Sequence, residues 1–350
     1  MNINKIFEKI SDWYSYEIEY AKNLTNSLLR KERKNGFNPF KVIVIKEIGD
    51  HIKSWRFLIM VGLIILTCFG SLYTSLNNMS KAVKPEDVEN TFFFLRLFTI
   101  TDGSLPSFIV FIGFLGPLLG LSLGFDAINY EQNKRTLSRL LAQPIHRDHV
   151  LNAKFAAALI VVGALMFSLV LMVIGIGLIA IGIPPTAEEF LRIICFTVLS
   201  IIYVALWINL SIFFSVQFRQ PATSALASIA VWLFFTVFYP LITNFLFTAL
   251  APASSAPPIK QFHFEQIKLF FMQLMPNELF SVATTTLLMP SIRSIGPLTM
   301  EQMIGTIPAP LPLFQSIMVV LPQIIGLIAA TLICFILSYV TFMRKEIRSH

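Results

Sequence analysis

The stretch PSFIVFIGFLGPLLGLSLGF, residues 106–125, decides the class of fold. No charged residue lies between Asp102 and Asp126. A helix of about 20 apolar residues is long enough to cross the roughly 30 Å hydrocarbon core of a bilayer. Backbone groups in that core must hydrogen-bond within the segment, so these residues are predicted to form a membrane-spanning helix.

The composition of the whole chain indicates several such helices. Of the 350 residues, 55% are hydrophobic and 13% are charged, and the mean hydropathy is +0.71. These values exclude a disordered chain and an ordinary soluble enzyme. The three cysteines all lie in apolar runs, so we predict neither a disulfide scaffold nor a metal site.

Five further uncharged windows are long enough for a span, so the chain is predicted to be an all-α integral membrane protein with six transmembrane helices. A segment rich in Pro, Ala and Ser follows span five, and 249–315 is predicted to be an outer segment whose stretch 259–290 forms one or two interfacial helices. The six spans are placed near 57–76, 106–125, 155–181, 193–216, 224–248 and 316–342.

The distribution of charge predicts the orientation. Of the 27 Lys and Arg residues, 20 fall in the two ends and in the loops on the same side, and the other seven fall in the opposite loops. With the acids included, the first side carries 20 − 11 = +9 and the second 7 − 9 = −2. Basic loops stay inside, so we expect a multi-pass protein of the cell (plasma) membrane with cytoplasmic N- and C-termini. The net charge of +7 is explained in this way without a nucleic-acid partner.

Two amphipathic stretches precede the first span. Residues 1–38 include a predicted interfacial helix, and 39–350 form the six-span domain. The run FKVIVIKEIGDHIKSWRF, residues 40–57, is predicted to be an elbow helix that lies flat and then turns into the membrane, with Lys46, Glu47 and Trp55 as its notable residues. Membrane anchoring and the docking of a partner both remain open for these stretches.

The loop after span two, 126–154, carries the most specific pattern. Asp126 and Glu131 follow the apolar run, and Pro144 is predicted to end a short helix because it lacks an N–H group. A short amphipathic helix between two spans is suited to passing force from a soluble partner into the membrane. Its apolar face consists of Leu137, Leu140 and Leu141.

These residues resemble the permease subunits of ABC-2 type ABC transporters, the exporter-like type V group. The family pattern of an acid, a Glu, Thr-Leu, a Leu-rich turn, Pro and Arg is similar to Asp126, Glu131, Thr136, Leu137, Leu140, Leu141, Pro144 and Arg147 here. The Lys46-Glu47 pair also looks like the pair before the family's first span. The family commonly has Gly before the Thr, where this chain has Arg135, so the shape of that turn is open.

The resemblance implies that separate subunits carry out ATP hydrolysis and transport. The chain has no G-x-x-x-x-G-K-[ST] phosphate loop, so it is not expected to be an enzyme or to bind a cofactor itself. ATP and Mg²⁺ would be bound by a separate ABC ATP-binding subunit, and a second copy or a paralogue of the permease would complete the transporter. The 126–147 loop would be the coupling helix, and export would be the direction of transport.

Other features have plainer explanations. Gly116, Gly120 and Gly124 form a stripe of small residues in span two, which packs within the chain or, alternatively, forms a dimer interface. Asn209, Ser211 and Asn244 either line a pathway or hold helices together. The alternatives for the whole protein are a transporter driven by an ion gradient, which normally needs ionisable groups near the midplane, and a membrane scaffold or assembly factor.

Overall fold

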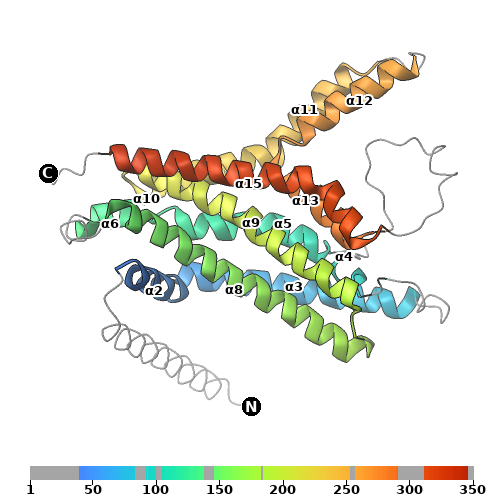
Figure 1. Cartoon of the computed structure of the whole chain (residues 1–350), viewed down its shortest axis with the longest axis horizontal. Helices are drawn as coiled ribbons and strands as arrows, with labels where there is room; N and C mark the ends of the chain where they lie inside the picture. Colours follow the sequence, from blue (N-terminus) through green and yellow to red (C-terminus); the bar gives the residue numbers. More distant parts are fainter. Residues whose placement is uncertain are drawn as a thin grey trace.

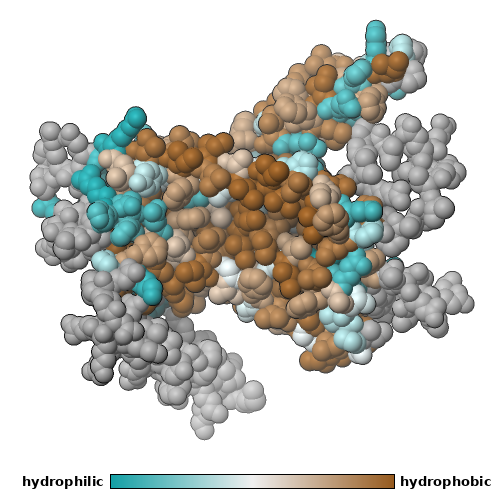
Figure 2. All heavy atoms as spheres, in the orientation of Figure 1, coloured by the Kyte–Doolittle hydropathy of each residue, from teal (hydrophilic) through white to brown (hydrophobic). Residues whose placement is uncertain are grey.

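The computed structural model describes residues 39–82, 92, 94–99, 105–137, 146–182, 184–252, 257–290 and 311–345. These residues are nearly all helical, and no strand occurs among them. The long helices pack side by side in a bundle (Figure 1), and Figure 2 shows an apolar belt between two more polar ends. The helices are α2 (Pro39–Ile52), α3 (Trp55–Ala82), α4 (Arg96–Thr99), α5 (Phe108–Gly124), α6 (Asn129–Asn133), α8 (Arg147–Ile181), α9 (Ala187–Gln217), α10 (Pro221–Leu233), η2 (Phe234–Phe238), α11 (Tyr239–Ala249), α12 (Pro258–Met272), α13 (Pro276–Leu288) and α15 (Leu313–Arg344).

Six segments are long and apolar enough to cross a membrane, which confirms the predicted number of spans. Successive spans run in opposite directions between two ends of the bundle (Figure 1). We call them the α2 end, where α15 finishes, and the α13 end, where α15 begins. The predicted helix within residues 1–38 lies outside the described residues. The six segments are Trp55–Asn77, Phe108–Asn133, Arg147–Ile181, Ala187–Gln217, Pro221–Ala249 and Leu313–Arg344.

Spans three and four begin earlier than the sequence predicts. The prediction stopped each span at a charged residue, whereas the helices continue through Lys154 and Arg192 because the fold pairs their charges. Arg192 is completely buried, and its Nη2 atom lies 2.8 Å from the Glu188 carboxylate. A capping box formed by Thr186 and Glu189 starts α9 at Ala187, before the predicted beginning of the span at Ile193.

The glycines of α5 allow a close approach to α9, the most buried span. A Cβ atom added at Gly120 would lie 2.9 Å from the Val204 carbonyl oxygen, and one added at Gly124 would lie 2.8 Å from that of Ile208. Neither distance is tolerated, so the backbones meet directly along this stripe. Of the two explanations for the stripe, the structure supports packing within the chain.

The segment between spans five and six contains two helices with different surroundings. Helix α12 lies beside α11, the last part of span five, and the two project together from the bundle (Figure 1), with the rings of Phe247 and Phe264 5.5 Å apart. Helix α12 exposes apolar residues such as Phe270, which fits the predicted surface helix. Helix α13 instead packs against α9 and α15, and Phe280 is buried there.

The packing of α5 on α9 predicts different changes in stability for Gly→Ala substitutions at two positions. Gly124→Ala should destabilise the protein by about 1–3 kcal/mol, because the new methyl group meets backbone atoms of α9. Gly175→Ala in α8 should be neutral or slightly stabilising, since nothing lies within 4 Å of its added Cβ and Ala favours helix. Thermal unfolding of the two variants in detergent compares them directly. Equal unfolding temperatures would contradict the packing of α5 on α9.

Candidate functional site

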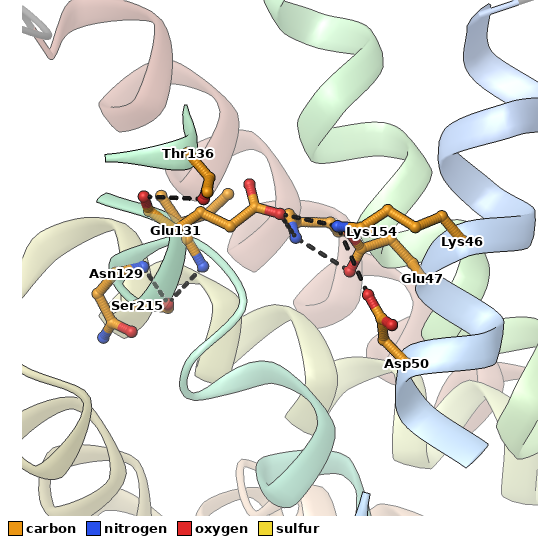
Figure 3. Close-up of polar contacts among 9 residues, drawn as sticks. Lys46, Glu47, Asp50, Asn129, Glu131, Thr136, Lys154 and Ser215 are labelled. Carbon is orange, nitrogen blue, oxygen red and sulfur yellow. Dashed lines mark hydrogen bonds and ion pairs between the residues drawn. The ribbon is translucent and has the colours of Figure 1, made fainter. Parts of the chain in front are cut away.

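Charged side chains from three separate segments meet at the α2 end of the bundle (Figure 3). Helix α2 contributes Lys46, Glu47 and Asp50, the short helix α6 contributes Glu131, and the start of α8 contributes Lys154. We call these five residues the ion cluster. Glu131 lies in the loop that the sequence singled out, so the cluster joins that loop to two other elements.

Lys154 stands at the centre of the ion cluster. Its Nζ atom lies 3.0 Å from a carboxylate oxygen of Glu47 and 3.0 Å from one of Glu131. Lys46 repeats this pattern from the more exposed side, with its Nζ atom 2.9 Å from Glu47 and 3.2 Å from Glu131. Each amino group therefore bridges the same two carboxylates, and α2, α6 and α8 are held together by alternating charges.

Burial makes this pairing obligatory. Only 4% of the Lys154 surface is exposed, and Glu47 and Glu131 are also buried. An unpaired charge in such a place is strongly unfavourable, whereas a charge with short contacts to opposite charges is tolerated. Removing either partner would leave an uncompensated charge, so the three elements must keep their relative positions.

Two of the three α2 residues in the ion cluster, Glu47 and Lys46, have shifted pKa values. Burial alone would raise the pKa of Glu47, but the charges of Lys154 and Lys46 outweigh it, and the pKa lies below the ordinary value of 4.5. Burial would likewise lower the pKa of Lys46, but the nearby carboxylates, Glu47 first, raise it above the ordinary value of 10.5. Both residues therefore stay charged across the physiological pH range.

The loop after α5 is also attached to α3 and α9. The Arg56 guanidinium at the start of α3 lies 2.6 Å from the Asp126 carboxylate and stacks over the Phe125 ring. The Ser215 hydroxyl near the end of α9 accepts hydrogen bonds from the backbone N–H groups of Ile128 and Asn129, at 2.9 and 3.2 Å. The loop thus makes polar contacts with α2, α3, α8 and α9.

A cavity of about 600 Å³ opens beside the ion cluster. Its lining is mostly charged or polar and includes Lys46, Glu131, Arg56, Asp126 and Lys134. The cavity lies between α2 and the loop, so a change in their separation would change its width.

The turn after α6 has the backbone conformation that the sequence left open. Arg135 has φ +57°, in the left-handed region that glycine adopts most easily. The chain therefore makes the glycine-type turn with an arginine, at a cost of about 1–2 kcal/mol. The turn places Leu137 in the core and lets the Thr136 hydroxyl donate to the Glu131 carbonyl oxygen at 3.3 Å.

The structure brings some of the predicted site residues together and separates others. Asp126 and Glu131 lie at the α2 end with Lys46 and Glu47, and Arg147 begins α8 there. Trp55 is 76% exposed at the start of α3. Three predicted contact residues lie outside the described part of the chain: Leu140, Leu141 and Pro144.

The three polar residues singled out within the spans have different surroundings. Ser211 of α9 donates a hydrogen bond to the Leu121 carbonyl oxygen of α5 at 2.9 Å, which is a helix-packing contact. Asn209 reaches the Thr331 carbonyl oxygen of α15 at 3.4 Å. Asn244 is exposed on α11 and lines a second cavity.

The sequence did not identify the central role of Lys154, which it placed only at the start of a span. Its partner Glu131 is 23 residues away and Glu47 lies much further back in the chain, so no local spacing relates them. Arg192 was likewise placed at a boundary, although its spacing of four residues from Glu188 was a detectable signal for an ion pair.

Comparison with known proteins gives one match. The family model described as "ABC-2 family transporter protein" matches residues 41–347, nearly the whole chain. The matched range includes most of α2, the loop after α5 and all six spans. No curated protein matches the chain.

The ion cluster predicts a large loss of stability from one substitution. Lys154→Met keeps the length of the side chain but leaves Glu47 and Glu131 buried with one partner fewer, so the free energy of unfolding should fall by about 3–5 kcal/mol. Lys53→Met, at an exposed position just after α2, is the matched control and should change it by less than about 0.5 kcal/mol. Thermal or denaturant unfolding in detergent measures both. Similar stabilities for the two variants would mean that the cluster does not hold the helices together.

The lowered pKa of Glu47 predicts how its contribution depends on pH. Its carboxylate stabilises the folded state fully above pH 4.5, and this stabilisation is lost as the pH falls through the lowered pKa of the folded state. The difference in unfolding temperature between wild type and Glu47→Gln should therefore be constant near neutral pH and shrink in acid. Glu265→Gln on α12, which removes a carboxylate far from the cluster, should show no such trend. A Glu47→Gln difference that grows in acid would contradict the assignment.

Proposed function

The chain belongs to the ABC-2 transporter family and is a multi-pass membrane permease, and on this premise we propose that it couples ATP hydrolysis by a separate subunit to export of a substrate. The observation that carries the proposal is the ion cluster. It ties the loop after α5, where a soluble partner would press, to α2 and α8 by buried ion pairs.

The contacts of the loop allow a force on the loop to reach several helices. A force on residues 126–147 would reach α8 through Glu131 and Lys154, and α3 through Asp126 and Arg56. It would reach α9 through the Ser215 hydroxyl. Packed helices move as rigid bodies, so a shift of the loop would be passed along the bundle instead of being absorbed locally.

ATP and Mg²⁺ belong to the partner in this proposal. The sequence has no phosphate loop of the G-x-x-x-x-G-K-[ST] type, so the ATP-binding subunit would supply the energy. The predicted coupling helix, with its contact residues Leu140, Leu141 and Pro144, would fit a groove on that subunit. The elbow helix α2, with Lys46 and Glu47, would move with it.

A second permease copy or a paralogue would complete the transporter. Span five is the least buried of the six spans, with 11% of the residues in its apolar window buried against 67% for span four. A second permease on this side would cover apolar surface that the single chain leaves to lipid. The positive charge of the α2 end favours a plasma-membrane orientation with both termini in the cytoplasm.

The positions of the charged groups favour ATP over an ion gradient as the driving force. Among the described residues, the buried charges of the spans lie near the helix ends. Lys154 and Arg192 form ion pairs, and Glu189 accepts hydrogen bonds in the capping box and from the Phe94 N–H. A transporter driven by an ion gradient normally carries ionisable or ion-coordinating groups near the membrane midplane.

Purification of the complex tests the proposal. The full chain should co-purify with an ABC ATP-binding subunit, and native mass spectrometry should count two permeases and two ATP-binding subunits. Leu140→Asp should abolish this association while the permease still inserts into the membrane, because a charge replaces an apolar contact residue.

Thr223→Asp is the matched control, because it places the same charge in the first turn of α10 at the same end of the bundle. It should leave the complex intact. Survival of the complex in Leu140→Asp would rule out the loop as the docking element, and the absence of any ATP-binding subunit from the wild-type preparation would overturn the proposed function itself.

A further inference from the structure

A second cavity, of about 420 Å³, lies at the α13 end, away from the ion cluster. Its walls come from three elements: the first turns of α5, the π-helix η2 with α11, and the α12–α13 corner. Nothing in the proposed coupling mechanism uses this cavity. Its position beside spans two and five nevertheless places it where a permease could hold a ligand.

The cavity combines apolar walls with one acidic group. The apolar residues of the lining include Phe114, Phe235, Phe280 and Met275. Glu278, near the start of α13, is the single ionisable side chain in the lining. It is half-buried, and no cation among the described residues forms an ion pair with it.

The surroundings of Glu278 favour a charged partner. Burial raises the pKa of its carboxyl group, which means that the carboxylate has lost part of its hydration. A cation that entered the cavity would restore a favourable interaction for the carboxylate. Aromatic faces around the cavity attract cations as well, since the ring carries partial negative charge on its face.

A chain of hydrogen bonds fixes one wall of the cavity. The Tyr203 hydroxyl of α9 donates to the Asn277 amide oxygen at 2.5 Å, and the Asn277 amide nitrogen donates to the Thr236 hydroxyl at 2.6 Å. Thr236 belongs to η2, a π-helical turn in the middle of span five. Single π-turns inside α-helices are frequent at functional sites. The wall is therefore built by polar contacts across three helices.

The cavity opens on the flank of the bundle. Val110 and Phe114 of α5 line it and are 56% and 47% exposed. The surrounding surface of spans two and five is apolar, so a ligand entering by this route would cross an apolar surface. An ion with an apolar body suits this route better than a small hydrated ion.

We propose that the cavity between α5, η2 and α13 binds a lipophilic cation, with the Glu278 carboxylate as the counter-charge and Phe114, Phe235 and Phe280 as the apolar cradle. This inference rests on the proposed function in naming the class of substrate. In this proposal the Glu278 carboxylate selects a positively charged ligand, and the shape of the cavity walls selects a ligand whose surface is apolar.

Two probes of nearly the same shape and opposite charge test the inference. Tetraphenylphosphonium is a lipophilic cation, and tetraphenylborate is the corresponding anion. Binding of each labelled ion to the purified full chain in detergent, without ATP or a partner subunit, is measured by scintillation proximity. The wild type should bind the cation at least tenfold more tightly than the anion.

Substitutions in the cavity test whether the preference for the cation arises there. Glu278→Gln, which keeps the shape of the side chain, should weaken cation binding at least tenfold, and Glu265→Gln on α12 should leave it unchanged. Val110→Trp, at an exposed position in the opening, should weaken binding of the cation without altering the charge. This variant keeps the test decisive should Glu278→Gln fail to fold.

The results separate the two proposals. Equal binding of the two ions by the wild type, or no binding of the cation, would overturn the inference. So would unchanged cation binding in Glu278→Gln or in Val110→Trp. Because these measurements need no ATP-binding subunit, such a result would leave the proposed coupling function standing, and failure of co-purification would leave the cation site standing.

Discussion

A buried lysine at the start of α8 imposes the arrangement of the α2 end. Lys154 is almost fully enclosed, so its charge must be matched, and the two carboxylates that match it come from α2 and from the loop after α5. This requirement explains why α8 continues through a charged residue and why α2 lies against α8. The loop with the family pattern is held at its base by the same charges.

The centre of the bundle depends on a different interaction, the close packing of α5 on α9. Small residues let these two backbones approach directly, and α9 then contacts α15 and α13 on its other faces. Since α9 runs from Arg192 at one end to Ser215 at the other, it connects the polar contacts of both ends. A rigid helix with polar contacts at each end provides a physical route between the ion cluster and the second cavity.

The two ends use buried charge in different ways. At the α2 end each buried charge has a partner within the chain, which fixes the relative positions of the helices. At the α13 end Arg192 is paired in the same manner, whereas Glu278 faces a cavity without a paired cation among the described residues. The paired charges hold the helices in place, and Glu278 is the carboxylate that we assign to a ligand.

The sequence by itself determined the class of protein, because membrane spans and the loop pattern of Asp126, Glu131 and Thr136 are local signals that hydropathy and spacing reveal. It predicted six spans and the family, and it selected Lys46, Glu47 and Glu131 as notable residues. Only the tertiary structure decided that these three meet around Lys154, that Arg192 is buried and that Glu278 faces a cavity. Ion pairs between residues as far apart as Lys46 and Glu131 depend on how the helices pack, and no local periodicity encodes that packing.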